Sequence, residues 1–407
     1  MIKTNNIKEE NKSNYSDLPD FSNHSIAFTS KNNSELKKTR LLFYLLNISW
    51  LNKLSTLLAS IAIKLHLPIN FIIKASIFKQ FCGGEDLIET GETIDKLAKY
   101  NVKTSLDYSV EGKKRDKDFH RTYKELLHII DFSSENNNIN FASLKITGLG
   151  KISFLISFNE GKKLTRVEKH HLKKVKHRLD RICAKASSKN FNIFIDAEES
   201  WYQDGIDELA TQMMKKYNKE RANIFNTIQL YRKDRLSFLK EAHKKAKEEG
   251  YFLGLKLVRG AYMEKENAYW EDKHSPTIIH DSKKDTDDAY NDAIRYCINN
   301  LNEISFCAAT HNAKSSLLVT ELMSEQKIPK DSENIHFSQL YGMSDHITYN
   351  LAYHGYNASK YLPYGPIRDV VPYLIRRAKE NSAIAGQMSR ELSLIYKETI
   401  RRKNKVK

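Results

Sequence analysis

Cysteine is scarce in this chain of 407 residues, and its cysteines lack the spacing of disulfide frameworks or metal sites. The four are scattered, with no CxxC pair: Cys82, Cys183, Cys297 and Cys307. Their distribution excludes a disulfide framework and a zinc site and indicates a reducing compartment. HxH and HExxH motifs are also missing, which argues against a hydrolase with a metal centre. We therefore expect no resident metal ion.

Long apolar runs are missing too. Residues 1–40 are polar, rich in Asn, Lys and Ser, and contain no signal-peptide core. The most apolar region, Leu41–Phe81, is interrupted by four lysines, so no stretch reaches the roughly 20 apolar residues of a spanning helix. We interpret it as packed helices, with contact to a membrane surface as the alternative. Because an arginine-rich presequence is missing, we expect a cytoplasmic protein, peripheral at the inner membrane, with a mitochondrial location as the alternative.

Acidic residues are outnumbered by basic ones, which gives a formal net charge of +16. Such a charge attracts nucleic acids, anionic membranes and anionic substrates alike, so it decides little alone. Much of the excess is lysine spread over residues 163–189, where a solvated helix surface is the simplest interpretation. No RNA-binding motif such as RGFGF occurs, and we expect no nucleic-acid partner.

Short apolar segments alternate with amphipathic helical segments after residue 100. The expected strands are Thr104–Tyr108, Phe141–Thr147, Phe191–Asp196, Ile224–Leu230, Phe252–Val258, Ile304–Ala309, Ile335–Leu340 and Lys360–Leu362. The alternation predicts parallel pairing, and eight such units predict an α/β fold, a closed (β/α)₈ TIM-like barrel. No GxGxxG follows a strand, which disfavours the alternative, a doubly wound open sheet.

The helical segments divide the chain into three parts. Between the strands, the periodicity predicts helices over Val167–Lys185, Asp234–Glu249, Asp287–Leu301 and Ser315–Met323. We predict that residues 1–30 are disordered, because they are poor in apolar side chains. Residues 31–100 are expected to form a helical N-terminal arm, and residues 101–407 the barrel.

Polar side chains recur where the predicted strands end, which is where barrel enzymes carry their active sites. The clearest case is Lys256–Met263, a buried strand that opens into a loop at Gly260. Two cations beside a glycine suit an anionic or electron-rich ligand, because glycine lets the backbone approach closely. The alternative is an ordinary strand with solvated basic ends. Other predicted strand ends carry Lys145, Asp196, Glu198, Glu199, Gln229, Tyr231, Thr310, His311, Asn312, residues 339–343 and Tyr361.

Two adjacent arginines, Arg376 and Arg377, lie in the last predicted helix of the barrel and precede Glu380. From the start of that helix, both guanidinium groups could reach a carboxylate at the barrel mouth and bind it bidentately. Glu380 follows Arg376 by four residues and could orient it. A surface ion-pair ladder is the alternative for this pattern.

Taken in order, these segments resemble the proline dehydrogenase family. The resemblance runs from about Ala27 to about Arg402 and is nearest to the monofunctional form, although bifunctional bacterial members often carry arginine in place of Lys256. The matching motifs are Ile195-Asp196-Ala197-Glu198-Glu199, Leu257-Val258-Arg259-Gly260-Ala261-Tyr262, Ala309-Thr310-His311-Asn312, Gly342-Met343, and Tyr373-Leu374-Ile375-Arg376-Arg377 with Glu380-Asn381.

The resemblance implies FAD across the barrel mouth and L-proline between the flavin and the last helix. Hydride transfer to flavin N5 would then yield 1-pyrroline-5-carboxylate. It implies catalytic roles for Lys145, Asp196, Tyr361, Arg376, Arg377 and Glu380, and substrate contacts from Lys145, Leu340, Tyr361, Tyr364, Arg376 and Arg377. It implies cofactor contacts from Gln229, Lys256, Arg259, Gly260, Ala261, Lys283, Thr286, Thr310, His311 and Asn312.

The resemblance also implies partners: a membrane quinone as electron acceptor and a separate pyrroline-5-carboxylate dehydrogenase. A hydroxyproline dehydrogenase is the alternative within the fold. Tyr361 argues against it, because the relatives that prefer hydroxyproline tend to carry a smaller residue there. A non-catalytic basic barrel that binds nucleic acid or membrane is the alternative from another class, which the absorption spectrum of a bound flavin would exclude.

Overall fold

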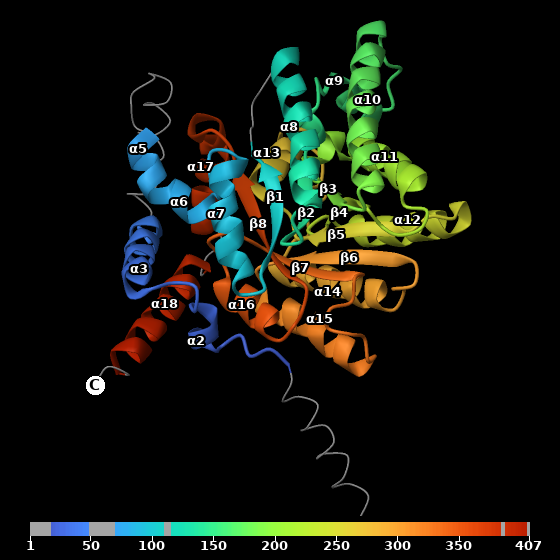
Figure 1. Cartoon of the computed structure of the whole chain (residues 1–407). Coiled ribbons are helices and arrows are strands. Elements are labelled where there is room, and N and C mark those ends of the chain that lie inside the picture. Colours follow the sequence, from blue (N-terminus) through green and yellow to red (C-terminus); the bar gives the residue numbers. More distant parts are fainter. Residues whose placement is uncertain (1–17, 49–69, 110–114, 384–386, 405–407) are drawn as a thin grey trace, which may run out of the picture.

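Eight parallel strands form a closed barrel in a computed structural model that describes residues 18–48, 70–109, 115–383 and 387–404 (Figure 1). The strands follow one another around the barrel in sequence order, and β8 pairs with β1 to close it. Their bounds are β1 Lys103–Tyr108, β2 Ile139–Leu144, β3 Asn192–Ile195, β4 Ile224–Gln229, β5 Leu253–Val258, β6 Ile304–Ala309, β7 Ile335–Leu340 and β8 Ala358–Tyr364. The predicted (β/α)₈ barrel and all eight predicted strands are confirmed.

Helices cover the outside of the barrel (Figure 1). They are α7 Leu87–Ala98, α8 Asp116–Ser134, α9 Ser153–Asn159, α10 Arg166–Ser188, α11 Ser200–Tyr217, α12 Arg235–Glu249, α13 Met263–Asp272, α14 Lys283–Ile298, α15 Ala313–Glu325 and α16 Asp345–Tyr353, with a 3₁₀ turn, η2, at Ile146–Gly148. α10 begins with a capping box between Thr165 and Glu168. α12 ends at Gly250, whose φ of +64° suits glycine.

Most predicted segments differ from the observed ones by a few residues, and two of these differences have a clear structural cause. The predicted second strand, Phe141–Thr147, ends at Leu144, because the 3₁₀ turn η2 takes up the residues that follow Lys145. The predicted helix Asp287–Leu301 begins four residues earlier, at Lys283, since the side chain of Ser282 caps the backbone N–H of Asp285.

Aromatic side chains from β2, β3 and β4 fill the lower part of the barrel interior. The rings of Phe141 and Phe194 are stacked with centroids 3.9 Å apart, and Phe225 packs edge-on against Phe141 at 5.2 Å. Residues two apart on a strand point to the same side, so Asp196 lies above Phe194, towards the carboxyl ends of the strands. The apolar plug thus supports a polar layer at the barrel mouth.

A second apolar cluster joins the first helices to the last ones. It contains Phe28, Phe43, Phe78, Tyr373 and Ile395. The elements that contribute to it lie together at one side of the barrel (Figure 1): α2 His24–Ala27, α3 Asn33–Asn47, α5 Asn70–Ile73, the π-helical turn η1 Lys74–Phe78, α6 Lys79–Phe81, α17 Ile367–Ala383 and α18 Gln387–Asn404.

The prediction of disorder over residues 1–30 is wrong for residues 18–30. Ala27 and Phe28 are buried in the second cluster, and α2 lies against α16 and α18. Local composition gave no hint of this, because the apolar partners come from the other end of the chain. Residues 1–17 lie outside the described residues. The division at residue 100 stays a prediction.

The predicted apolar periodicity of the arm is described only in part. Residues 49–69, which include Leu51, Leu54, Leu57 and Leu58, lie outside the described residues. In the part of the chain that the structure covers, none of the helices combines the length and the apolar character that a membrane crossing demands.

The four cysteines are buried and free.

Candidate functional site

Three of the predicted site residues meet around a fourth, the carboxylate of Asp196, at the barrel mouth. Lys256 Nζ donates to Asp196 Oδ1 at 2.7 Å, and the hydroxyl of Tyr361 donates to Asp196 Oδ2 at 2.9 Å. Lys145 Nζ lies 3.8 Å from the same Oδ2. Lys256 also sits over the ring of Tyr361, 4.5 Å from its centroid. The residues that directly follow β2 and β3 and one residue each within β5 and β8 thus form a site network, which we define as Lys145, Asp196, Lys256 and Tyr361.

Electrostatics fix the protonation states within the site network. Burial would raise the pKa of Asp196, but the cations of Lys256 and Lys145 outweigh it and hold that pKa below its usual range. Burial, together with the carboxylates of Asp107 and Asp196, raises the pKa of Tyr361 well above its usual range. The carboxylate therefore stays charged, and the phenol stays a hydrogen-bond donor.

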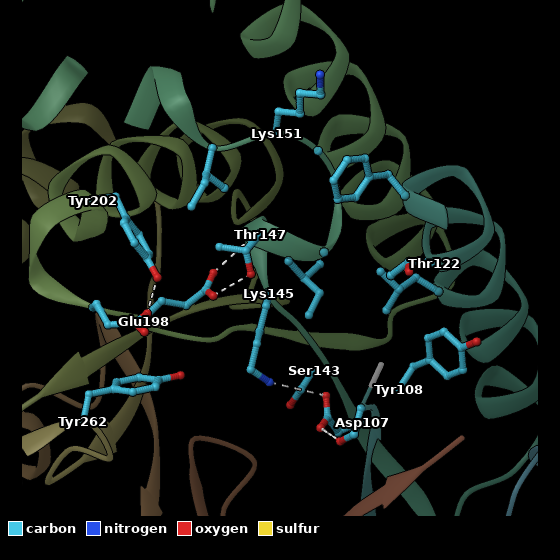
Figure 2. A pocket seen from close by; sticks show the side chains of 18 of the residues that line it. Asp107, Tyr108, Thr122, Ser143, Lys145, Thr147, Lys151, Glu198, Tyr202 and Tyr262 are labelled. Atoms are coloured by element: carbon cyan, nitrogen blue, oxygen red, sulfur yellow. Dashed lines mark hydrogen bonds and ion pairs between the residues drawn. The ribbon is translucent and has the colours of Figure 1, made fainter. Parts of the chain in front are cut away.

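A cavity of about 560 Å³ opens beside Lys145 (Figure 2). Its polar lining includes Asp107, Lys145, Glu198 and Tyr202. The amine of Lys145 points towards Asp107, and their closest N–O distance is 3.9 Å. Within the site network, Lys145 lines this cavity, whereas Asp196, Lys256 and Tyr361 lie outside its lining.

Asp107 was not singled out from the sequence, and Glu198 was noted at a strand end but given no role in the site. Asp107 comes at the end of β1, and strand-end position was the signal that could have found it. Glu198 accepts hydrogen bonds from the backbone N–H of Thr147 at 3.1 Å and from its hydroxyl at 2.6 Å. Burial raises the pKa of Glu198 to about 7, although the Thr147 donors oppose the shift. Glu198 therefore anchors the turn that follows Lys145.

Arg259 forms a second centre, at the ends of β5 and β6. Its Nε donates to Asp287 Oδ1 at 2.7 Å, one terminal nitrogen donates to Thr310 Oγ1 at 2.6 Å, and the other donates to Ser315 Oγ at 2.9 Å. The guanidinium also lies 4.3 Å from the centroid of the Tyr290 ring. One side chain therefore ties β5 to α14, β6 and α15.

Three further residues predicted for the cofactor lie near this Arg259 centre. Lys283 donates to Asp287 from the first turn of α14, and Thr286 is buried one turn later. Asn312 caps α15, and its amide lies 3.4 Å from Asp287 Oδ1. The structure thus brings Arg259, Lys283 and Asn312 together at Asp287, a carboxylate that the sequence did not single out, and Thr310 joins this group through Arg259.

Gln229 is the last residue of β4, and Gly260 lies in the loop after β5. The Gln229 amide donates to the backbone carbonyl of Glu198 at 2.9 Å, while its buried Oε1 accepts no hydrogen bond from the described residues. Gly260 has φ +148°, and a Cβ there would lie 2.4 Å from the ring of Tyr231. Glycine is required at this position both by backbone conformation and by packing. Ala261 follows in the same loop and is exposed.

The remaining predicted residues make contacts outside these two groups of hydrogen bonds, or their side chains are not described. His311 Nδ1 lies 2.8 Å from Ser344 Oγ, in the turn after β7. Tyr364 is fully buried and donates to Glu125 of α8 at 2.6 Å, and Leu340 packs against the second apolar cluster. The side chains predicted to bind a carboxylate, those of Arg376, Arg377 and Glu380 in α17, lie outside the described residues.

Sequence comparison connects this barrel mouth to a known family. The family model for proline dehydrogenase matches residues 90–390. The chain belongs to the proline dehydrogenase family. Mitochondrial proline dehydrogenase 1 of Dictyostelium discoideum is 32% identical over 421 residues, which cover 92% of this chain and 74% of the relative. The carbapenem antibiotics biosynthesis protein CarD of Pectobacterium carotovorum subsp. carotovorum is 33% identical over 322 residues, or 79% and 83%.

Two further matches have lower sequence identity to this chain. A hydroxyproline dehydrogenase of Xenopus laevis is 29% identical over 413 residues, which cover 92% of this chain and 88% of the relative. Among solved structures, proline utilization A (PutA) of Bdellovibrio bacteriovorus superposes with a TM-score of 0.70 at 20% identity. That match covers 89% of this chain but only 38% of the PutA chain. At this identity it supports the barrel fold.

Proposed function

We propose that this chain oxidises L-proline to 1-pyrroline-5-carboxylate with FAD, the first step of proline catabolism to glutamate. Family membership identifies an oxidoreductase. The single observation in the structure that carries the proposal is the site network, in which two lysines and a tyrosine converge on buried Asp196 at the ends of four strands. Such a preorganised polar layer suits a reaction that depends on positioning and electrostatics more than on a nucleophile.

The residues at the ends of β4, β5 and β6 fit a large polar cofactor. The buried Gln229 Oε1 accepts no hydrogen bond from the described residues, and a ring imide N–H of a flavin would supply the donor. The Arg259 centre, with Lys283, Thr286, Thr310 and Asn312, offers cations and hydroxyl and amide groups to a phosphate and ribose. Lys256, Gly260, Ala261 and His311 complete the proposed contacts. When bound, FAD supplies the hydride acceptor.

The chain's own residues would then orient the substrate. Lys256 places a fixed positive charge at the mouth, where it stabilises negative charge that develops during the reaction. Asp196 holds Lys256 and Tyr361 in place. Lys145, Arg376 and Arg377 would bind the proline carboxylate, with the arginines oriented by Glu380. The proposed wall of the ring pocket is Leu340, Tyr361 and Tyr364, although the contact of Tyr364 with Glu125 places its hydroxyl towards α8.

We also propose a setting for this reaction. A quinone in a membrane would accept the electrons, and a separate pyrroline-5-carboxylate dehydrogenase would consume the product. The chain would then act in the cytoplasm, peripheral at the inner membrane, with a mitochondrial location as the alternative. The net charge of +16 supports attachment to an anionic bilayer.

Anaerobic mixing of the purified protein with L-proline tests the proposal. The expected result is loss of the oxidised flavin absorption near 450 nm, an approximate position typical of flavoproteins. Arg376→Met and Arg377→Met should keep the flavin and raise the KM for proline roughly tenfold or more, because a charge-assisted hydrogen bond is lost. A protein that purifies without flavin, or whose flavin proline does not reduce, would contradict the proposal.

A further inference from the structure

The turn between β7 and α16 is held in an uncommon conformation by a distant helix. Ser344 has φ +51° and ψ +41°, in the left-handed region that non-glycine residues seldom occupy. Its backbone N–H donates to Glu391 Oε1 at 2.8 Å, and Glu391 is almost fully buried near the start of α18. A strained residue persists only where its surroundings hold it, and here a carboxylate 47 residues downstream contributes to that.

The same serine contacts a residue that we propose for the cofactor. Ser344 Oγ and His311 Nδ1 lie 2.8 Å apart, so the hydroxyl fixes the orientation of the imidazole ring. Ser344 therefore has one hydrogen-bond partner on α18, Glu391, and another in the loop after β6, His311. Any shift of its backbone changes the direction of the Oγ and with it the ring of His311.

Buried charges on the next residue strengthen this junction. Asp345 accepts from Lys360 of β8 at 2.8 Å and from Lys31 of the N-terminal segment at 2.8 Å. The side chain of Lys360 is 1% exposed, and its amine also donates to the backbone carbonyl of Met343 at 2.5 Å. Glu391 adds a second acidic side chain near the buried amine of Lys360 and the half-buried amine of Lys31. Breaking such an arrangement is costly, because it leaves a buried charge without its partner.

We propose that Glu391 is a positioning residue for the cofactor: by binding the backbone of Ser344, it orients His311 towards the flavin nucleotide. The proposal rests on the proposed function, because His311 is a cofactor contact only there. Glu391 need not touch the cofactor. Its effect should therefore appear in cofactor affinity, whereas the KM for proline at saturating FAD should stay unchanged.

The test compares Glu391→Ala with two matched variants. Glu391→Gln keeps a carbonyl oxygen that can accept from the Ser344 N–H. Glu398→Gln alters another buried glutamate of α18, which pairs with Arg401 and Arg402 and not with the turn. FAD dissociation constants are measured by the fluorescence of released flavin, alongside melting temperatures of the apoproteins and the KM for proline at saturating FAD.

We expect Glu391→Ala to raise the FAD dissociation constant roughly ten- to a hundredfold, the loss typical of a charged hydrogen bond. Glu391→Gln should recover most of this affinity, and Glu398→Gln should lower the melting temperature without changing affinity. Combining Glu391→Ala with Ser344→Ala should cost no more than the larger single effect, because both act through one contact.

Two outcomes separate this inference from the proposed function. A wild-type protein that binds flavin, together with a Glu391→Ala variant of equal FAD affinity, would overturn the inference alone. Equal losses of affinity in Glu391→Ala and Glu398→Gln would also overturn it, since the effect would then be general destabilisation of α18. A wild-type protein that binds no FAD would overturn both.

Discussion

Four buried carboxylates near the barrel mouth differ in charge because their partners differ. Asp196 and Asp345 each lie beside two lysines, whose cations hold the pKa of both below the usual range despite burial. Burial raises the pKa of Glu198 and of Glu391 to about 7, and both accept from uncharged donors, of Thr147 and Ser344. For Glu391 the neighbouring carboxylate of Asp345 adds to the rise in pKa, and the cations of Lys360 and Lys31 offset only part of it. Neutral donors offset desolvation less than cations do.

The raised pKa of Glu198 predicts a pH dependence of stability. The folded value of about 7 lies above the ordinary 4.5, so folding favours the protonated carboxyl group. The contribution is fully present below the unfolded pKa and is lost as pH rises through 7, a change on the order of 3 kcal/mol. Glu198→Gln should therefore flatten the fall in unfolding free energy between pH 5 and pH 8, measured in urea. Glu135→Gln, at an exposed position, is the control, and equal pH slopes in wild type and Glu198→Gln would refute the prediction.

The position of Tyr361 leads us to predict a preference for proline over hydroxyproline. Hydroxyproline is the substrate in the name of the Xenopus relative. The buried phenol of Tyr361 is fixed by Asp196, so a ring hydroxyl of the substrate would meet a filled site and stay unpaired, at a cost of about 1–3 kcal/mol. Wild type should prefer proline roughly ten- to a hundredfold in kcat/KM, and Tyr361→Ser should narrow the ratio. Tyr251→Phe, which alters a buried tyrosine just before the start of β5, is the control. A wild-type preference for hydroxyproline would show that Tyr361 does not face the substrate.

At the scale of elements, Arg259, the residue directly after β5, holds several elements of the barrel mouth together. It connects β5 to α14 through Asp287 and to β6 and α15 through Thr310 and Ser315. Lysine keeps the charge, but its single ammonium nitrogen cannot reach the three separate partners that Arg259 contacts through the three nitrogens of its planar guanidinium group. Arg259→Lys should therefore lower the unfolding free energy by about 2 kcal/mol and weaken FAD binding.

A structural arginine on a neighbouring helix provides the comparison for Arg259. Arg235 of α12 pairs with Asp207 and Asp234, and its side chain is 5% exposed. Arg235→Lys should lower stability by a similar amount while FAD affinity stays at the wild-type value. Chemical denaturation measures the unfolding free energy of both variants, and titration with FAD measures their FAD affinity. Unchanged FAD affinity in Arg259→Lys would remove the Arg259 centre from the cofactor site.

The strands were predictable because parallel barrel strands are buried on both faces and therefore occur as apolar runs. The prediction for β8 was too short at both ends, since Lys360 lies inside the strand and is buried against Asp345. Pairs of this kind cannot be recognised in a sequence before the partner's place in space is known. The same holds for Asp287 beside Arg259 and for Glu391 beside Ser344. The members of the site network were found because they lie at strand ends.

At the scale of the whole molecule, the chain has a net positive charge of +16 and also exposes apolar side chains on one helix, α3. Leu41, Tyr44 and Leu45 are 60%, 56% and 40% exposed and recur at three- and four-residue spacing along one helix face. Lys37, Lys38 and Arg40 belong to the same helix. An apolar face flanked by cations is typical of helices that lie on anionic membrane surfaces.

This combination predicts binding to anionic vesicles that weakens as salt rises, because charges are screened beyond roughly 8 Å at physiological ionic strength. Leu41→Ser with Leu45→Ser should reduce binding in a flotation assay at low salt. Ile88→Ser, which alters an exposed apolar residue on α7, serves as the control. If the α3 variant and wild type float equally, α3 does not carry the attachment.

Arg402 of α18 donates hydrogen bonds to the backbone carbonyls of Phe28 and Lys31, 374 and 371 residues earlier in the chain. These carbonyls therefore leave the ribosome long before their donor is synthesised. At roughly 5–20 residues per second, the interval is on the order of 20 to 70 seconds. During that time the apolar side chains of Phe28 and Phe43 lack Ile395, their partner on α18. For a nascent chain of this protein, the first segment made must be among the last to reach its final packing.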